Sequence, residues 1–118
     1  MNGATTAVVG AYAFSGVDQT NPITTTSSNF NSAASSPTVS ITTANPNSLV
    51  LDLPSIYGGV TLGKSTCTQQ WDANVPSAIT GASSSTAAQS PEQVTCSWTA
   101  SGGGDLWDDV AVEIKAAG

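Results

Sequence analysis

The segment Val94-Thr95-Cys96-Ser97-Trp98-Thr99 decides the fold class of this chain. Apolar and hydroxyl side chains alternate along it without interruption, which is the pattern of a β-strand with one buried face and one solvated face. We therefore expect Val94, Cys96 and Trp98 to point into a core and the three hydroxyl residues to point away from it.

The same alternation recurs on both sides of this segment, and each strand signal ends at Pro, Gly, Asn or Ser. Upstream, the range Thr38 to Thr43 turns Val39 and Ile41 inward. The next strand carries Leu49, Leu51 and Leu53 on the face that we expect to be buried, with Val50 and Asp52 on the other. In the last strand the expected inward row is Val110, Val112 and Ile114, and the expected outward row is Ala111, Glu113 and Lys115.

Three further strand signals complete the pattern: Ala7 to Val17, the weaker Val60 to Leu62, and Thr66 to Asp72, in which Cys67, Gln69 and Trp71 share a face. Two ranges of small polar residues, Thr24 to Ser36 and Ser77 to Ser90, are expected to be long loops or ragged edge strands. No range keeps an apolar stripe at helical spacing, so helix should be nearly absent. The chain is therefore predicted to be all-β, with residues 1–118 forming a single antiparallel β-sandwich of about 6–8 strands, Ig-like or jelly-roll-like.

Composition excludes several classes of function. The chain has 118 residues, enough for one domain, and a net charge of −6 with two basic side chains, Lys64 and Lys115, and no histidine. Binding phosphates takes several Lys or Arg side chains, so we expect no nucleic acid and no anionic membrane surface as a partner. The longest apolar run, Ala7 to Phe14, is too short to cross a bilayer and lacks the flanks of a signal peptide.

Cys67 and Cys96 are the two cysteines of the chain. In a chain poor in charge and rich in Ser and Thr, a pair on neighbouring strands favours a disulfide over two buried thiols. A disulfide implies an oxidising location, which here means extracellular, on a cell surface or in a virion. Trp71 and Trp98 each share a face with a cysteine and are expected to pack against the bond, although the cysteine spacing is not that of an immunoglobulin domain.

The range Gly10 to Ile23, GAYAFSGVDQTNPI, resembles the "SFSGVDQTTPI" segment of a β-sandwich domain found in bacterial, archaeal and phage-associated surface proteins. Similar motifs follow in the same order: "dLVLDL" at Ser48 to Leu53, "QxW" at Gln69 to Trp71, "vTxSWT" at Val94 to Thr99 and "W..VAVEIK" at Trp107 to Lys115. The resemblance implies a module without catalytic residues, often repeated in extracellular or adhesive proteins. The family's domain carries strands before the first motif, so the resemblance also implies a sheet that lacks its leading strands here.

Few side chains suit catalysis. With no His, and with both Cys expected in a bond, the candidates are carboxylates, lysines and hydroxyls. A glycosidase pair would need Glu92 and Glu113, but the first follows Pro91 in a turn and the second lies on an outward row, so solvated positions explain both. We predict no catalytic residues and no enzyme.

Two binding features are weighed against simpler explanations. Asp105, Asp108 and Asp109 form a weak calcium candidate beside three glycines, although hydrated loop charges are the default interpretation and no other cofactor is expected. Trp107 shares the parity of the outward residues, where it could stack on a sugar or anchor a partner; the alternative, which we favour, is that it caps one end of the core. Tyr57 is a second contact candidate.

The leading hypothesis is a non-enzymatic structural or adhesive module that acts through its surface and through contacts with neighbouring copies. A carbohydrate-binding module using Trp107 and Tyr57 is the alternative, and a hydrolase fragment is a distant one. If leading strands are missing, either the range Thr24 to Ser36 or the range Ser77 to Ser90 folds back as an edge strand, or another copy completes the sheet. The scarcity of lysines, which usually protect sheet edges, favours a homo-oligomer.

Overall fold

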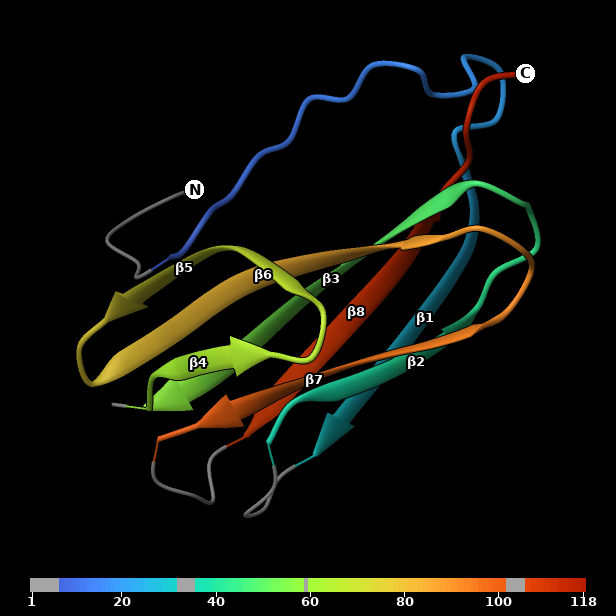
Figure 1. Cartoon of the computed structure of the whole chain (residues 1–118). Helices are drawn as coiled ribbons and strands as arrows, with labels where there is room; N and C mark the ends of the chain where they lie inside the picture. The colour runs from blue at the N-terminus through green and yellow to red at the C-terminus, as the bar shows by residue number, and fades with distance from the viewer. Residues whose placement is uncertain (1–6, 32–35, 59, 102–105) are drawn as a thin grey trace.

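The computed structural model describes residues 7–31, 36–58, 60–101 and 106–118. Within them the chain forms eight strands and no helix, arranged in the two layers of a β-sandwich (Figure 1). One layer has five strands in the order β1-β8-β3-β6-β5, the other has three in the order β2-β7-β4, and neighbouring strands are antiparallel. The strands are β1 Ile23–Asn31, β2 Thr38–Thr42, β3 Ser48–Gly58, β4 Leu62–Ser65, β5 Thr68–Val75, β6 Ala78–Ala88, β7 Gln93–Ala100 and β8 Trp107–Ile114. The predicted all-β sandwich is confirmed.

The core lies between the two layers in two clusters. In one, Val39 and Ile41 of β2 pack against Val50 of β3 and Ala111 of β8. The other cluster is built around two tryptophans and consists of Ile56, Val60, Leu62, Ala82, Trp98 and Trp107. The inward positions predicted for β2 and for Cys96 and Trp98 of β7 are confirmed, because these side chains are buried.

The faces predicted for β3 and β8 are wrong. Val50, Asp52, Ala111 and Glu113 point into the sandwich, so the leucine row of β3 lies on the outer face of the five-stranded sheet. Both strands are central and part of their outer face is also buried, so apolar residues occupy both rows and alternation does not tell the faces apart. Charged side chains are rarely buried without a partner, which is why Asp52 and Glu113 were expected outside.

The two ranges of small polar residues form strands. The range Thr24 to Ser36 contains most of β1, an edge strand beside β8, which corresponds to the fold-back alternative at this edge. The range Ser77 to Ser90 contains β6, which is a central strand, so its prediction as a loop or edge strand is wrong. Small side chains suit β6 because it is largely buried while paired to a neighbour on each side.

The range Ala7 to Val17 is not a strand, contrary to the sequence prediction. Residues 7–15, here called the arm, run in an extended path along the outside of β5 and β6 (dark blue in Figure 1). Ladder pairing begins only at Val17, which forms an isolated bridge with Ala116. The arm covers part of the sheet without joining it. Across the described ranges, no helix is long and apolar enough to cross a membrane.

Candidate functional site

The two outer faces of the sandwich differ in chemistry. On the three-stranded sheet, hydroxyl side chains pair across β2 and β7: the Oγ1 of Thr38 lies 2.7 Å from the Oγ of Ser97, and the Oγ of Ser40 lies 2.7 Å from the Oγ1 of Thr95. We call this surface the hydroxyl face. Its side chains satisfy one another or water, and they offer little apolar area to a partner.

The outer face of the five-stranded sheet carries exposed apolar side chains instead. Leu53 and Val110 are directly opposite each other on β3 and β8 and are 37% and 40% exposed. Further along, Phe30 of β1 and Tyr57 of β3 are 77% and 58% exposed, and Leu106 lies beside them. We call these five residues the outer patch. The paired residues Ser55 and Asp108 separate Leu53 and Val110 from the other three members. Exposed apolar side chains that gather on one face indicate an interaction site.

The outer patch ends in a hollow of about 380 Å³. Its apolar wall is formed by Phe30, Tyr57, Ile79 and Leu106, and Trp107 lies at its base, buried in the core. A polar pair sits in the same hollow, where the Oγ of Ser55 donates to the Oδ1 of Asp108 at 2.6 Å. Aromatic rings beside a carboxylate and a hydroxyl can accommodate both the apolar and the hydroxyl faces of a ligand.

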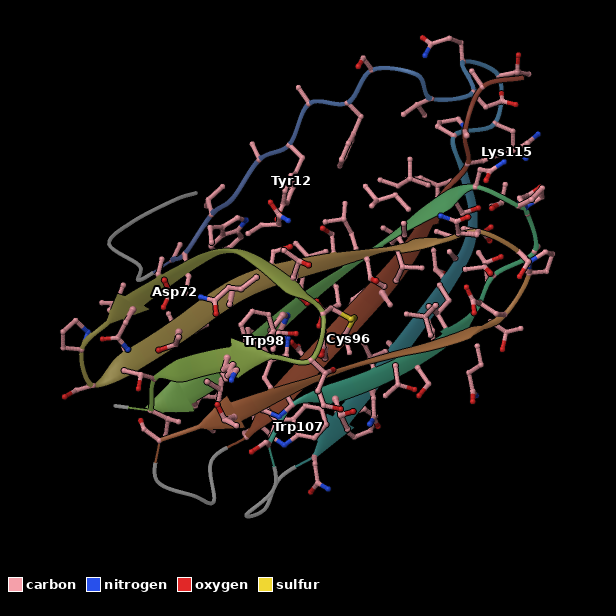
Figure 2. The ribbon with its side chains drawn as sticks, viewed as in Figure 1. Tyr12, Asp72, Cys96, Trp98, Trp107 and Lys115 are labelled. Atoms are coloured by element: carbon pink, nitrogen blue, oxygen red, sulfur yellow. A yellow bond between two sulfur atoms is a disulfide. The ribbon has the colours of Figure 1, made fainter. Side chains whose placement is uncertain are left out.

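The arm covers the other part of this outer face. Gly10 lies against the ring of Trp71, so close that an added Cβ would be 2.1 Å from the ring atom Cζ2. Val8 lies over Gly81 of β6, and the rings of Tyr12 and Phe14 stack with their centroids 5.7 Å apart. Figure 2 shows Tyr12 between the arm and the sheet. Glycine at these two positions allows the arm to approach closely.

Trp71 therefore does not pack against the disulfide as predicted. The ladder between β5 and β6 shifts register between Gln69 and Trp71, so these two residues do not keep one parity. The shift turns Trp71 to the outer face, beneath the arm. A bulge of this kind is not visible in the alternation of a sequence.

Three carboxyl groups are buried inside the sandwich, and all three were missed by the sequence prediction. The first two, Asp52 and Asp109, point inward from β3 and β8 and are both 0% exposed. The Oδ2 of Asp52 accepts a hydrogen bond of 2.8 Å from the Nε1 of Trp98, and its Oδ1 accepts bonds from the backbone N and the Oγ of Ser84. Neither carboxyl oxygen of Asp109 has a hydrogen-bond partner of ordinary geometry.

Burial raises the pKa of Asp109 from 3.8 to about 9, and the neighbouring Asp52 adds to the rise. The carboxyl group of Asp109 is therefore protonated and uncharged at neutral pH. Because both groups are sealed from solvent, the pair cannot transfer protons to a bound substrate. It is a structural feature of the core.

The third buried carboxyl group, that of Glu113, holds the turn between β2 and β3. Its oxygens accept hydrogen bonds from the backbone N of Ala44 at 3.0 Å, the backbone N of Asn45 at 2.9 Å and the Oγ of Ser48 at 2.7 Å. Burial alone raises the pKa of Glu113, but these bonds and one from Thr25 outweigh it and lower the pKa from 4.5 to about 2. The expected solvated position of Glu113 is wrong, and no catalytic pair with the exposed Glu92 results.

The structure separates the calcium candidates. Asp108 is exposed on the outer face and bonded to Ser55, while Asp109 faces the core from the next position of β8. Asp105 lies outside the described residues. In the described part of the chain, no three His, Cys, Asp or Glu residues gather as metal ligands.

The contact candidates have different outcomes. Trp107 is 3% exposed and belongs to the tryptophan cluster of the core. The favoured interpretation as a core residue is therefore correct, and the assignment of Trp107 to the outward row of its strand is wrong. Tyr57 is exposed and lines the hollow. Phe30 was missed, although a lone aromatic residue in a stretch of Thr, Ser and Asn was a usable signal of a surface contact.

Cys67 and Cys96 are joined by a disulfide, with their Cα atoms 5.4 Å apart. Cys67 lies in the turn between β4 and β5, and Cys96 lies on the inward row of β7. The bond therefore ties the connection between the two layers to the middle strand of the three-stranded sheet (Figure 2).

No family model matches this chain, and no curated protein does. Among solved structures, the chain is similar to a chain of the tripod (BppUct-A-L) from the baseplate of bacteriophage Tuc2009, at 14% sequence identity and a TM-score of 0.44. The similarity covers 98% of this chain and 82% of that chain. A likeness of this level assigns no function.

Proposed function

We propose that this chain is a non-enzymatic structural or adhesive module of an extracellular, cell-surface or virion assembly, and that it binds neighbouring copies of itself through the outer patch. The observation that carries the proposal is the contrast between the two outer faces. Exposed apolar side chains gather on the five-stranded sheet, while the opposite surface is lined by paired hydroxyl groups. Burying apolar area on one face gives association a favourable free energy and a direction.

The small number of charged side chains limits repulsion between copies of the chain. Only eight carboxylates and two lysines are distributed over 118 residues. The exposed carboxylate of Asp108, bonded to Ser55, lies between the members of the outer patch, so two patches can meet only in a register that keeps the two Asp108 carboxylates apart. The disulfide is the support for an oxidising, extracellular or virion setting.

Light scattering across a hundredfold dilution tests the proposal. The wild-type mass should rise with concentration, and the double substitution Leu53→Asn with Val110→Thr should keep the mass of a monomer, because it makes the centre of the patch polar. The matched control is Ser40→Asn on the hydroxyl face, which should associate as the wild type does. A constant monomer mass for the wild type over the whole range would refute association between copies.

A neutral carbohydrate is the second candidate partner, and the hollow favours it. Two exposed aromatic rings can stack on a sugar ring, while Asp108 and Ser55 can bond its hydroxyl groups. An acidic sugar is disfavoured because one of the two lysines, Lys115, is already paired with Asp18 at 3.0 Å.

A glycan array with wild type, Tyr57→Ala and Phe30→Ala tests this candidate. Binding that both substitutions remove would support it, and Thr95→Ala on the hydroxyl face is the control. Trp107→Ala is not a useful probe, because that side chain belongs to the core. An array with no reproducible signal for the wild type would eliminate the hollow as a sugar site.

A further inference from the structure

We propose that the arm is exchangeable: residues 7–15 of one copy can leave their own sheet and cover the same site on the sheet of a second copy. This deepens the proposed function, because it names the element that two copies exchange. The proposal rests on four features of the arm and of the surface beneath it.

First, the arm has a specific seat. Gly10 fits against the ring of Trp71 with no room for a Cβ, and Val8 fits over Gly81, whose own added Cβ would lie 3.0 Å from a Val8 methyl group. Two glycines, one on the arm and one on the sheet, thus make a close contact possible. The same seat exists on every copy, so an arm from another copy can make identical contacts.

Second, only side chains hold the arm in its seat. Between residues 7 and 15, the described structure contains no backbone hydrogen bond from the arm to the sheet. The Oη of Tyr12 and the Nε1 of Trp71 are buried there without a hydrogen-bond partner. A buried polar group without a partner favours the open state, in which water can bond it. The arm can therefore leave without breaking any ladder of the sandwich.

Third, a pivot follows the arm directly. Gly16 has a φ of 72°, a conformation that glycine adopts freely. The chain immediately beyond it is fixed: the backbone N of Asp18 donates to the carbonyl O of Lys115 at 3.0 Å, and their side chains form an ion pair. The arm can therefore swing about Gly16 while the sandwich stays closed.

Fourth, the surface beneath the arm needs cover. Leu51 and Ile114 lie on the outer rows of β3 and β8 yet are only 4% and 8% exposed, and Phe14 of the arm lines a hollow with Leu49 and Ile114. An open arm exposes this apolar surface, and the arm of another copy restores its burial. Leu53 and Val110 lie further along the same rows and belong to the outer patch, so two copies that meet there bring an arm near a seat.

A designed disulfide distinguishes exchange from closure within one chain. An added Cβ on Gly81 would lie 3.5 Å from the Cβ of Val8, a separation that suits a disulfide, so Val8→Cys with Gly81→Cys should cross-link whichever arm occupies the seat. The double variant is oxidised at concentrations from about 10 μM to about 1 mM, because a short tether holds its own arm at an effective concentration of the order of mM. Non-reducing gels and peptide mass spectrometry then show whether the introduced thiols join one chain or two.

Exchange predicts that cross-links between chains rise with concentration, to a fraction comparable to the links within one chain at about 1 mM. Each single cysteine variant is the control for random thiol pairing. Links confined to single chains at every concentration overturn the proposal. If patch-dependent association is still seen by light scattering in that case, the proposed function stands and only the exchange is lost.

A second measurement avoids the substitutions, in case the double variant does not fold. Equal amounts of isotope-labelled and unlabelled wild-type chain are refolded together and concentrated. An isotope-filtered NOE between Gly10 of one chain and the Trp71 ring of another supports exchange. Detection of this NOE only within chains overturns it.

Discussion

Replacing Asp109 with Asn should stabilise the protein at neutral and alkaline pH, and the gain should grow as the pH rises. The carboxyl group of Asp109 is fully buried without a hydrogen-bond partner of ordinary geometry, and burial beside Asp52 raises its pKa from 3.8 in the unfolded chain to about 9 in the folded protein. A raised pKa means that the stability available from this group is complete below pH 3.8 and declines as the pH rises through about 9. An amide has no proton to lose and shows no such decline.

The magnitude follows from the size of the shift. Each pH unit between the two pKa values lowers the free energy of unfolding by about 1.4 kcal/mol. A pH of 7 lies about three units above 3.8, so the free energy of unfolding of Asp109→Asn should exceed that of the wild type by about 4 kcal/mol at pH 7. The difference should be almost nothing near pH 4. This is an upper figure, because water entering the core would lower the pKa of Asp109 and shrink the gain.

Urea unfolding followed by tryptophan fluorescence measures the effect, since Trp98 and Trp107 are buried in the core. Wild type and variant are compared in steps from about pH 4 to about pH 9, the window that the two pKa values define. The control is Asp108→Asn on the exposed side of the same strand, which should change stability by less than about 1 kcal/mol at every pH. Parallel pH profiles for the wild type and Asp109→Asn would show that the buried carboxyl group is not protonated as inferred.

Three further outcomes are expected. Titration of thiols in the unfolded, unreduced protein should find none, because Cys67 and Cys96 are bonded, a bond that stabilises by about 3–4 kcal/mol in the chain-entropy model; two titratable thiols would disprove it. Leu51→Ala should lower the free energy of unfolding by about 2–5 kcal/mol, because the side chain is buried on the outer face of β3. Thr95→Ser on the hydroxyl face should change it by less than about 0.5 kcal/mol, and equal melting of the two variants would contradict the burial of Leu51. Glu113→Gln should cost about 2–3 kcal/mol above pH 4.5 and progressively less as the pH falls towards 2, since the wild type then loses the same carboxylate; a cost that does not change with pH would refute the role of the charge.

The three-stranded sheet was predictable from the sequence because its strands are covered on one side only. Val39 and Ile41 alternate with hydroxyl residues, and Cys96 and Trp98 do the same, so one row had to be buried and the other solvated. Alternation fails when both faces are covered. Apolar side chains of β3 contact the second sheet on one face and the arm on the other. The prediction placed the leucine row on the inner face, and this exchanged the two faces of the strand.

The candidate site was only partly predictable. Tyr57 stood out as an aromatic residue beside glycine, but nothing local showed that Phe30 would face the same hollow from another strand. That meeting depends on the pairing of β1 with β8 and of β8 with β3, which is a property of the whole sheet. The buried carboxyl groups were missed for a related reason, since their hydrogen-bond donors come from distant parts of the chain, as Trp98 does for Asp52.

The asymmetry of the two faces bears on the form that an assembly takes. The outer patch and the arm's seat lie on the same side of the five-stranded sheet, while the opposite side of the sandwich presents paired hydroxyl groups. Two copies whose outer patches meet can exchange arms reciprocally, and such a dimer buries the outer patch and the seat of the arm on both copies. A filament needs a second, complementary surface elsewhere on the molecule, and the hydroxyl face offers little apolar area for it. Association through these surfaces should therefore close as a dimer, and the mass measured by light scattering should reach a plateau at twice that of the monomer.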